Sequence, residues 1–517
     1  MTRLPAILAA FGLLLCAGAS AQEESAATRA APARQSVVIG SKSFTESVIL
    51  GEMAAMLARE AGVEVRRRKQ LGGTRILFEA VARGDIDVYP EYTGTLKEEI
   101  FAGRGVETLD DIEGALAERG LGMTGALGFD NTYAIAMREA RAAELRIDTI
   151  SDLRDHPDLR LGWGNEFIDR GDGWGALRDR YRLPQQDVRG LDHDLAYRGL
   201  EAGDIDVMDA YATDAEIEYY RLRVLEDDLG HFPEYQAVFV YRLDLREQAP
   251  RVLAELRRLE GAIDAATMSG LNKAVKIDGR PDGDVAAEFL ESQFGVSPAV
   301  ERPSRLRNLW QRTVEHTRLV GISMLFATLM AVPLGVLAAK ARLMEQPTLA
   351  VVGVAQTIPS LAFLALLVPL QGIGERSAII ALTVYSLLPI VRNTHAGIVS
   401  IPGSMCDAAA SLGLSRRDHL LYIDLPLAAP SIFAGLKTAA VLNVGTATLG
   451  ALIGAGGYGQ PILTGIRLDD PILILEGAVP AAVMAIAAQR GLDLVEQLVV
   501  PRGLRTSSAP GRNGRRK

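Results

Sequence analysis

Apolar residues are distributed very differently in the two halves of this 517-residue chain. From about residue 36 to residue 307, short apolar stretches alternate with charged residues, as they do in a soluble α/β protein. From about residue 316 onward, apolar runs recur that are long enough to cross a bilayer, which takes roughly 20 residues per helix. The chain is also too long for one ordinary domain. The pattern therefore predicts a soluble domain followed by a membrane domain.

Five membrane spans are expected in the second half. Their approximate ranges are 316–339, 348–370, 377–400, 428–453 and 471–489. Basic residues follow the first span at Lys340 and Arg342, the third at Arg416 and Arg417, and the fifth from Arg502. Because basic loops tend to stay in the cytoplasm, this spacing places the soluble half on the extracytoplasmic side of a bacterial inner membrane.

The N-terminus has the pattern of a secretory signal. Arg3 precedes a short apolar core, and Ala19-Ser20-Ala21 offers a small-residue cleavage site. We expect a signal peptide over residues 1–21, a disordered leader over 22–35 and a basic cytoplasmic tail over 501–517. An uncleaved membrane anchor is the alternative for the first segment.

A five-residue motif occurs twice in the soluble half. Gly84–Val88 and Gly203–Val207 both read GDIDV, and a tyrosine follows each copy, at Tyr92 and Tyr211. In each copy glycine ends a helix, a short Ile/Val strand follows, and the tyrosine lies just past it. Ligands bind beyond the carboxyl ends of such strands. The repeat therefore predicts two similar lobes around a shared cleft, as in binding proteins that close on a ligand.

Further candidate cleft residues lie at neighbouring turns. One helix is expected to begin at Phe44-Thr45 and another at Thr74. Asn131 and Tyr133 stand at the start of a strand, and Tyr197 lies on the helix before the second motif. Several aromatic faces around a cation attract it, and a quaternary ammonium has no N–H to donate. We therefore expect an aromatic cage, although core packing is the alternative for each ring taken singly. The expected cage residues are Tyr92, Tyr133, Tyr197 and Tyr211.

A polar segment separates the third and fourth spans. It reads DAAASLGLSRRDHLLYIDLP and resembles the EAA loop of ABC-importer permeases, a cytoplasmic helix that docks on a separate ATPase. Aspartate opens the segment where that family usually has glutamate. The resemblance implies an ATPase-coupling segment over residues 403–426. The residues that carry it are Asp407, Ala408, Ala409, Gly413, Leu425 and Pro426.

Polar or helix-bending residues interrupt the apolar runs. Because intramembrane polar groups are costly, they usually face a cavity or another helix. We expect a translocation path lined by Gln356, Pro359, Asn393 and Asn443. Snorkelling toward the cytoplasm is an equal alternative for the charged residues Arg392 and Lys437.

Other motifs extend the resemblance. SKSFTES, GGT, DVYPEYTGT, NTYAIAM and AYATD resemble the solute-binding domains of glycine betaine/choline-type ABC importers, and QTIPSLAFLALLVPL, LLPIVRNT and GALIGAGGYGQ resemble their permeases. The likeness implies the cage described above, with Phe44 and Asn131 nearby. It also implies contacts from Thr45, Thr74 and Thr93 to the carboxylate or hydroxyl end of the ligand. Ser47 stands where the family commonly has glutamine, which leaves the ligand open.

Catalytic signatures are absent from the sequence. No G-x-x-x-x-G-K-[ST] phosphate loop occurs, so ATP would be used by a partner subunit. The six histidines and two cysteines lack metal-ligand spacing, and the GDIDV carboxylates are better explained as turn chemistry than as acid/base catalysts. No basic patch interleaved with aromatics favours nucleic acid. We expect no enzyme activity, and no metal or cofactor bound by this chain.

These observations predict a two-lobed α/β periplasmic-binding-protein (type II) domain followed by an all-α transmembrane ABC permease domain. The binding domain is expected over residues 36–298, with lobe 1 at about 36–129 and 237–298 and lobe 2 at about 130–236. A linker over 299–315 would lead to the permease at 316–500.

The expected function is import of a quaternary-ammonium solute such as glycine betaine or choline. Cytoplasmic ATPase subunits and a second copy of the chain are the expected partners, besides the ligand and the lipid bilayer. Ergothioneine, carnitine or another zwitterion is the alternative cargo. A ligand-sensing membrane receptor without transport is a remote alternative.

Overall fold

The computed structural model describes residues 36–300, 304–468 and 470–500, without the side chain of residue 410. The predicted signal peptide, leader and basic tail lie outside the described residues, as do residues 301–303 of the predicted linker. The binding domain and the helical domain are described in turn.

The first lobe is built on a five-stranded sheet of order β2-β1-β3-β10-β4. β1, β2 and β3 run parallel, whereas β10 is antiparallel to both neighbours. The strands are β1 (Ser36–Gly40), β2 (Glu64–Arg68), β3 (Val88–Tyr92), β4 (Leu121–Met123) and β10 (Ala237–Arg242). The helices and helical turns are α2 (Thr45–Glu60), α3 (Thr74–Arg83), α4 (Thr93–Thr95), η1 (Leu96–Ile100), α5 (Leu109–Ala117), α11 (Leu245–Gln248), α12 (Pro250–Arg257), α13 (Ala265–Lys276) and α14 (Asp282–Phe294).

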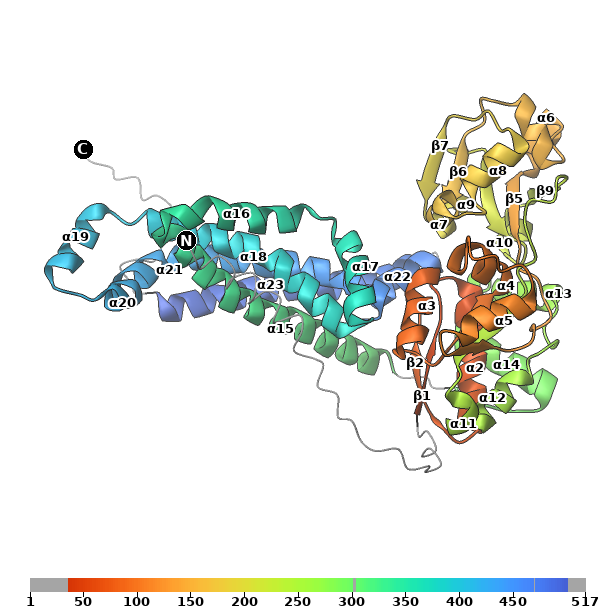
Figure 1. The fold of residues 1–517 in the computed structure, drawn as a ribbon, viewed down its shortest axis with the longest axis horizontal. Helices are drawn as coiled ribbons and strands as arrows, with labels where there is room; N and C mark the ends of the chain where they lie inside the picture. Colours follow the sequence, from red (N-terminus) through yellow and green to blue (C-terminus); the bar gives the residue numbers. More distant parts are fainter. Residues whose placement is uncertain (1–35, 301–303, 469, 501–517) are drawn as a thin grey trace, which may run out of the picture. The chain divides into compact units, whose positions relative to one another are not determined.

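The second lobe repeats this plan with a sheet of order β7-β6-β8-β5-β9, drawn in yellow and orange tones in Figure 1. The strands are β5 (Tyr133–Arg138), β6 (Leu161–Gly164), β7 (Val188–Leu191), β8 (Val207–Tyr211) and β9 (Leu222–Leu225). The helices and helical turns are α6 (Glu139–Leu145), η2 (Ile150–Asp155), α7 (Asn165–Asp169), α8 (Trp174–Tyr181), α9 (His193–Ala202) and α10 (Glu216–Tyr219). The chain crosses between the lobes before β5 and again before β10.

The two GDIDV copies occupy equivalent places in the two sheets. Gly84 ends α3 and Gly203 ends α9, both in the left-handed conformation with φ near 80°. In each copy the second aspartate accepts a backbone N–H from a neighbouring segment. Val38 donates to Asp87 at 2.8 Å and Arg160 donates to Asp206 at 3.0 Å. These carboxylates therefore anchor adjacent segments, as the turn-chemistry interpretation requires.

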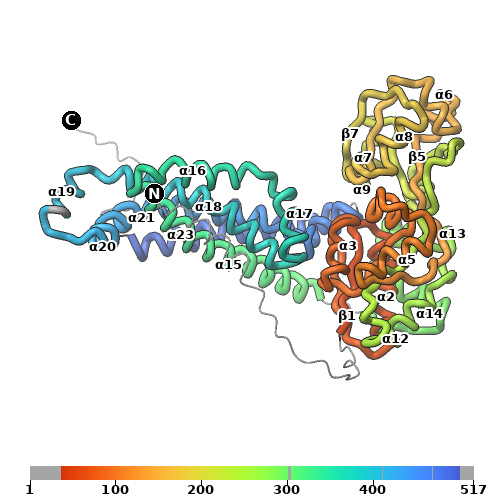
Figure 2. The backbone as a smooth tube through the Cα atoms, viewed as in Figure 1, coloured from red at the N-terminus to blue at the C-terminus, as the bar shows by residue number. Residues whose placement is uncertain are grey.

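The second half of the chain is helical throughout its described part. Its helices and helical turns are α15 (Arg305–Lys340), α16 (Arg342–Thr357), α17 (Ser360–Gln371), α18 (Glu375–Val399), α19 (Gly403–Ser411), α20 (Arg416–His419), η3 (Leu420–Asp424), α21 (Leu425–Ala447), η4 (Thr448–Ile453), α22 (Gly459–Arg467) and α23 (Pro471–Val499). The long helices α15, α18, α21 and α23 pack along one another (Figure 2). Together with the sheets of the first half, they confirm the predicted fold class.

Four stretches of the described chain are long and apolar enough to cross a membrane: α15, α18, residues 416–453 and α23. The predicted span 348–370 falls instead on α16 and α17, which pass the same test only as a pair bent by 93°. Pro359 precedes the first residue of α17 and has no N–H to continue α16, while Ile358 before it is extended. A break therefore stands where one continuous span was expected.

Candidate ligand-binding site

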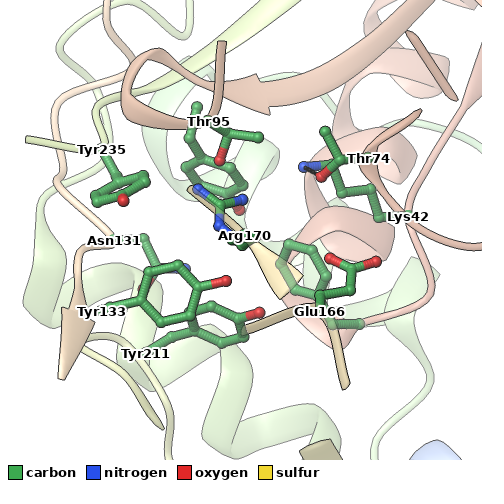
Figure 3. A pocket seen from close by; sticks show the side chains of 11 residues that line it. Lys42, Thr74, Thr95, Asn131, Tyr133, Glu166, Arg170, Tyr211 and Tyr235 are labelled. Atoms are coloured by element: carbon green, nitrogen blue, oxygen red, sulfur yellow. Dashed lines mark hydrogen bonds between the residues drawn. The ribbon is translucent and has the colours of Figure 1, made fainter. Parts of the chain in front are cut away.

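Aromatic rings gather between the lobes because several of them stand at strand ends. Tyr92 ends β3, and Tyr133 at the start of β5 pairs directly with Tyr211 at the end of β8. The Tyr133 and Tyr211 ring centroids are 5.1 Å apart. Phe44, just before α2, lies 5.7 Å from Tyr211, and Tyr235 lies 5.7 Å from Tyr133. We call these five residues the aromatic cage; Figure 3 shows Tyr133 and Tyr211 side by side.

A cavity of ≈ 30 Å³ lies within this group. Besides the cage, polar side chains from both lobes line it, so the space combines ring faces with charges and hydroxyl groups. The lining residues are Lys42, Phe44, Thr74, Tyr92, Thr95, Asn131, Tyr133, Glu166, Arg170, Tyr211 and Tyr235.

Lys42 brings a positive charge to the cavity from the first lobe. It lies two residues after the end of β1 and is buried. Its ammonium group donates to Thr74 Oγ1 at 3.0 Å and to Glu91, and lies 5.5 Å from the centroid of the Tyr92 ring. Since Glu91 is fully buried, the pair satisfies the general requirement that buried charges be compensated.

Arg170 brings a second positive charge, from the second lobe. Its guanidinium makes two hydrogen bonds to Asp172, at 2.8 and 2.7 Å. It also lies over the rings of Tyr133 and Tyr235, 5.2 and 5.9 Å from their centroids. Burial would raise the pKa of Asp172, but the hydrogen bonds and charge of Arg170 outweigh it and lower that pKa. These ring faces therefore already stabilise a cation.

A second cavity, of ≈ 150 Å³, adjoins the first and shares Lys42, Phe44, Glu166 and Tyr211 with it. Its lining is more acidic, because three aspartates and Glu166 contribute to it. The residues that line it are Lys42, Ser43, Phe44, Gly72, Gly73, Gly164, Asn165, Glu166, Phe167, Leu191, Asp192, His193, Asp194, Asp209 and Tyr211.

His193 connects this second cavity to the cage. Its ring lies 4.6 Å from that of Tyr211, its Nε2 is 3.0 Å from Asp214, and its Nδ1 is 3.7 Å from Asp209. Burial would lower the pKa of His193, but the hydrogen bond to Asp214 and the negative charges of Asp214 and Asp209 raise it well above its ordinary value. The His193 ring is therefore held against Tyr211 and fixes one side of the cage.

Glu46 fixes the other side of the cage through a hydrogen bond from Tyr92. This α2 carboxylate is almost fully buried and accepts four hydrogen bonds. The donors are Tyr92 Oη (2.5 Å), Asn131 Nδ2 (2.9 Å), Asn272 Nδ2 (3.2 Å) and the Thr213 hydroxyl. Burial raises the pKa of Glu46 to about 7, although these donors oppose the shift. The carboxylate thus fixes Tyr92 and joins segments of both lobes.

We expect the stability of the binding domain to depend on pH through Glu46. Its pKa is about 7 when folded, against 4.5 ordinarily, so the folded state binds its proton more tightly. This contribution is present below about pH 4.5 and is lost as the pH rises through 7, on the order of 3 kcal/mol in all. Thermal unfolding of residues 36–298 at pH 5 and pH 8 measures it. Glu46→Gln should flatten the dependence, and an unchanged dependence would contradict the assignment.

Six of the nine predicted ligand residues line the first cavity: Phe44, Thr74, Tyr92, Asn131, Tyr133 and Tyr211. Tyr197 is not among the residues that line either cavity, since its hydroxyl donates to Asp214 and its ring stacks on Tyr220. Thr93 also points elsewhere, because its hydroxyl donates to the Glu234 carbonyl and accepts from Gln236 N–H. Thr45 is buried at the start of α2 and is likewise outside both linings.

Sequence reasoning missed the charged part of the site, namely Lys42, Glu166 and Arg170, and also Tyr235 and His193. Lys42 lies within the SKSFTES motif, where its position two residues past the end of a strand was a usable signal. Glu166 and Arg170 lie in a glycine-rich stretch, residues 162–175, that has no phosphate-cradle spacing. A search restricted to aromatic and hydroxyl side chains could not find them.

The predicted coupling segment forms two short helices joined at a glycine. Asp407 and Ala408 are exposed on α19, and Ala409 is buried. Gly413 follows α19 with φ +73°, in open space. η3 leads into Leu425 and Pro426, which begin α21 and are half-buried. Large apolar side chains are exposed along this segment at Leu412, Leu421 and Tyr422.

The four predicted path residues lie in different surroundings. Asn443 is buried and donates to Ser323 at 3.0 Å and to Ser386 at 2.7 Å, so it joins α15, α18 and α21. Asn393 donates to the carbonyl of Pro389, one turn before it in α18. Gln356 and Pro359 lie at the bend between α16 and α17. Asn443 therefore connects three helices, and the path role of the four residues stays a prediction.

Each half of the chain matches a family model. Residues 35–292 match the substrate binding domain of ABC-type glycine betaine transport system, and residues 331–503 match the binding-protein-dependent transport system inner membrane component. A choline transport system permease protein of Bacillus subtilis is 38% identical over 196 residues, covering 38% of this chain and 90% of that protein.

Two further relatives cover about half of the chain. An ergothioneine transport permease/ergothioneine binding protein of Helicobacter pylori is 34% identical over 262 residues, which are 49% of this chain and 47% of that protein. A crystal structure of a glycine betaine/carnitine/choline ABC transporter is 29% identical, with a TM-score of 0.43, and covers 50% of this chain and 98% of that one.

Proposed function

Because the chain belongs to the osmoprotectant-type ABC importers, as a substrate-binding domain joined to an inner-membrane permease domain, we propose that it captures a quaternary-ammonium zwitterion and passes it across the membrane. Glycine betaine is the simplest such ligand. The binding domain would close on it through the cleft between its lobes.

The observation that carries this proposal is the pairing of an aromatic cage with two basic side chains in one cavity. The rings would surround a trimethylammonium group, which lacks donors and is attracted by their faces. Lys42 and Arg170 would hold a carboxylate by charge-assisted hydrogen bonds. Since Lys42 lies in the first lobe and Arg170 in the second, a bound carboxylate would connect the lobes and favour closure.

The same geometry favours a zwitterion over choline. Choline carries a hydroxyl group in place of the carboxylate and would leave the positive charges of Lys42 and Arg170 without an added anion. Hydrogen bonds to charged groups contribute more than neutral ones. Glycine betaine should therefore bind more tightly than choline, by about tenfold or more for a difference of roughly 1.4 kcal/mol.

We propose that transport uses the remaining parts of the chain in a larger assembly. Cytoplasmic ATPase subunits would dock on residues 403–426, and a second copy of the chain would complete the pathway. The binding domain would then lie outside the membrane, which agrees with the basic loops at the opposite side. Support comes from the exposed apolar side chains of this segment and from the match of the permease domain.

Reconstitution tests this proposal. The chain is combined with a candidate ABC ATPase in proteoliposomes, and uptake of labelled glycine betaine is followed with ATP on the ATPase side. Uptake should require ATP, the ATPase and the binding domain together. Ligand binding without ATP-dependent uptake with any partner ATPase would instead favour a receptor.

Ergothioneine is the second candidate, and the acidic second cavity favours it. This zwitterion joins a trimethylammonium and a carboxylate to a heterocycle with N–H donors. Asp192, Asp209 and Glu166 could accept hydrogen bonds from those N–H groups. The relative from Helicobacter pylori agrees with this choice. Asp192→Asn, at a residue that lines only the second cavity, should weaken ergothioneine binding and spare glycine betaine if that cavity is used; equal effects on both ligands would exclude that role.

A further inference from the structure

We propose that Cys406, His419 and Asp424 form a reversible Zn²⁺ site within the predicted coupling segment. One ligand atom from each residue lies within 4.8 Å of the other two. Cys406 lies on α19, whereas His419 and Asp424 end α20 and η3, which follow one another directly, so two helical stretches meet here. A thiolate, an imidazole and a carboxylate together are a donor set suited to zinc.

Asp424 supplies an independent indication of a cation site. Its side chain is 1% exposed, and its Oδ1 has no hydrogen-bond partner among the described residues. The other oxygen, Oδ2, is 2.6 Å from Lys340 Nζ and 3.0 Å from His419 Nδ1. A buried carboxylate oxygen without a partner is costly. A cation bound to Oδ1 would satisfy it while Lys340 keeps Oδ2.

The geometry fits a site that fills and empties. In a tetrahedral zinc site the ligand atoms stand on the order of 3.5 Å apart, so the present cluster needs to contract by only about 1 Å. Cys406 and His419 are half-buried, and His419 already lies against Asp424. Three protein ligands leave the fourth position to water, as in zinc sites that remain open. Such a site binds more weakly than a closed four-ligand site.

Zinc would connect the two ends of the segment across Gly413. α19 lies before this glycine, whereas α20 and η3 lie after it. A bond network from Cys406 to Asp424 would hold the two parts together and oppose any relative movement. If the segment couples to an ATPase, which rests on the proposed function, zinc should slow transport and leave ligand capture unchanged.

Metal binding is tested on the purified full-length chain in a Cys16→Ser background, so that Cys406 is the remaining thiol. Co²⁺ replaces zinc as the probe, because a thiolate ligand gives it an intense charge-transfer absorption. We expect this absorption in the parent chain, its loss in Cys406→Ser and its weakening in His419→Ala. His395→Ala removes a histidine outside the cluster and should change nothing. No charge-transfer absorption in the parent, or the same absorption in Cys406→Ser, overturns the site.

Thiol alkylation gives a second readout that does not depend on transport. Zn²⁺ alone should slow alkylation of Cys406 by about tenfold or more, because a metal-bound thiolate is a poor nucleophile. The effect should disappear in Asp424→Asn. Glycine betaine titrations of the same variants show whether the chain is folded. Equal alkylation rates with and without zinc overturn the proposal, whatever the outcome for the ligand.

Discussion

Replacing Tyr211 with alanine is expected to weaken binding of glycine betaine by roughly 5- to 30-fold, which corresponds to about 1–2 kcal/mol. Tyr211 is central to the aromatic cage, since its ring contacts those of Phe44, Tyr133 and His193. Its loss removes one cation-attracting face and lets the neighbouring rings separate. Calorimetric titration of the purified chain measures the effect.

Tyr211→Phe is the matched control for this prediction. It keeps the ring and removes only the hydroxyl group, so affinity should stay within about twofold of the parent if the ring face is what matters. Tyr219→Ala is a second control, because this ring is 59% exposed and is outside both cavity linings. Equal losses for Tyr211→Ala and Tyr211→Phe would contradict the cage and favour a hydrogen-bonded ligand.

Replacing Gly413 with valine is expected to abolish transport while ligand affinity stays unchanged. Gly413 has φ +73°, a conformation that β-branched residues avoid at a cost on the order of 1–3 kcal/mol. The turn between α19 and α20 would therefore change shape and misplace the docking surface. Uptake in proteoliposomes and ligand titration, measured on the same preparation, separate the two effects.

Two further variants distinguish conformation from bulk. Gly413→Asn should retain much of the transport, because asparagine tolerates the left-handed conformation. Gly403→Ala, at the start of α19, adds a Cβ where nothing lies within 4 Å and should have little effect. Loss of ligand binding in Gly413→Val would mean that the segment does not have a coupling role.

The plan of the binding domain was readable from the GDIDV repeat. Its glycines fix left-handed helix ends at Gly84 and Gly203, and the strands that follow take the same place in two sheets. Because each strand begins at a fixed distance from its glycine, Tyr92 and Tyr211 fall at the ends of β3 and β8. Local sequence therefore predicted where these two rings stand.

Side-chain direction was not readable in the same way. Tyr197 lies on α9 beside the cleft, yet the neighbouring Asp214 takes its hydroxyl and Tyr220 its ring face. Arg170 lines the cavity because two residues orient its guanidinium: Asp172, which is close to it in sequence, and Tyr235, which is far from it. Such choices depend on contacts that only the folded chain assembles.

The membrane half shows the same limit. Hydropathy located the long apolar stretches, but the break between α16 and α17 depends on how Ile358 and Pro359 direct the chain, and the 93° bend cannot be obtained from composition. Asn443 was expected to line a path because it is a polar residue in an apolar run, and its side-chain amide donates to two serines on other helices.

Titration of the purified chain with glycine betaine, choline and N,N-dimethylglycine tests the central claim most directly. A cage with two basic groups predicts the order glycine betaine, then choline, because the carboxylate engages Lys42 and Arg170. It also predicts weaker binding of dimethylglycine, because its protonated amine keeps an N–H that loses its hydrogen bond to water among the ring faces, whereas a trimethylammonium group has no N–H. Choline bound as tightly as glycine betaine, or no preference for the quaternary ammonium, would contradict the account.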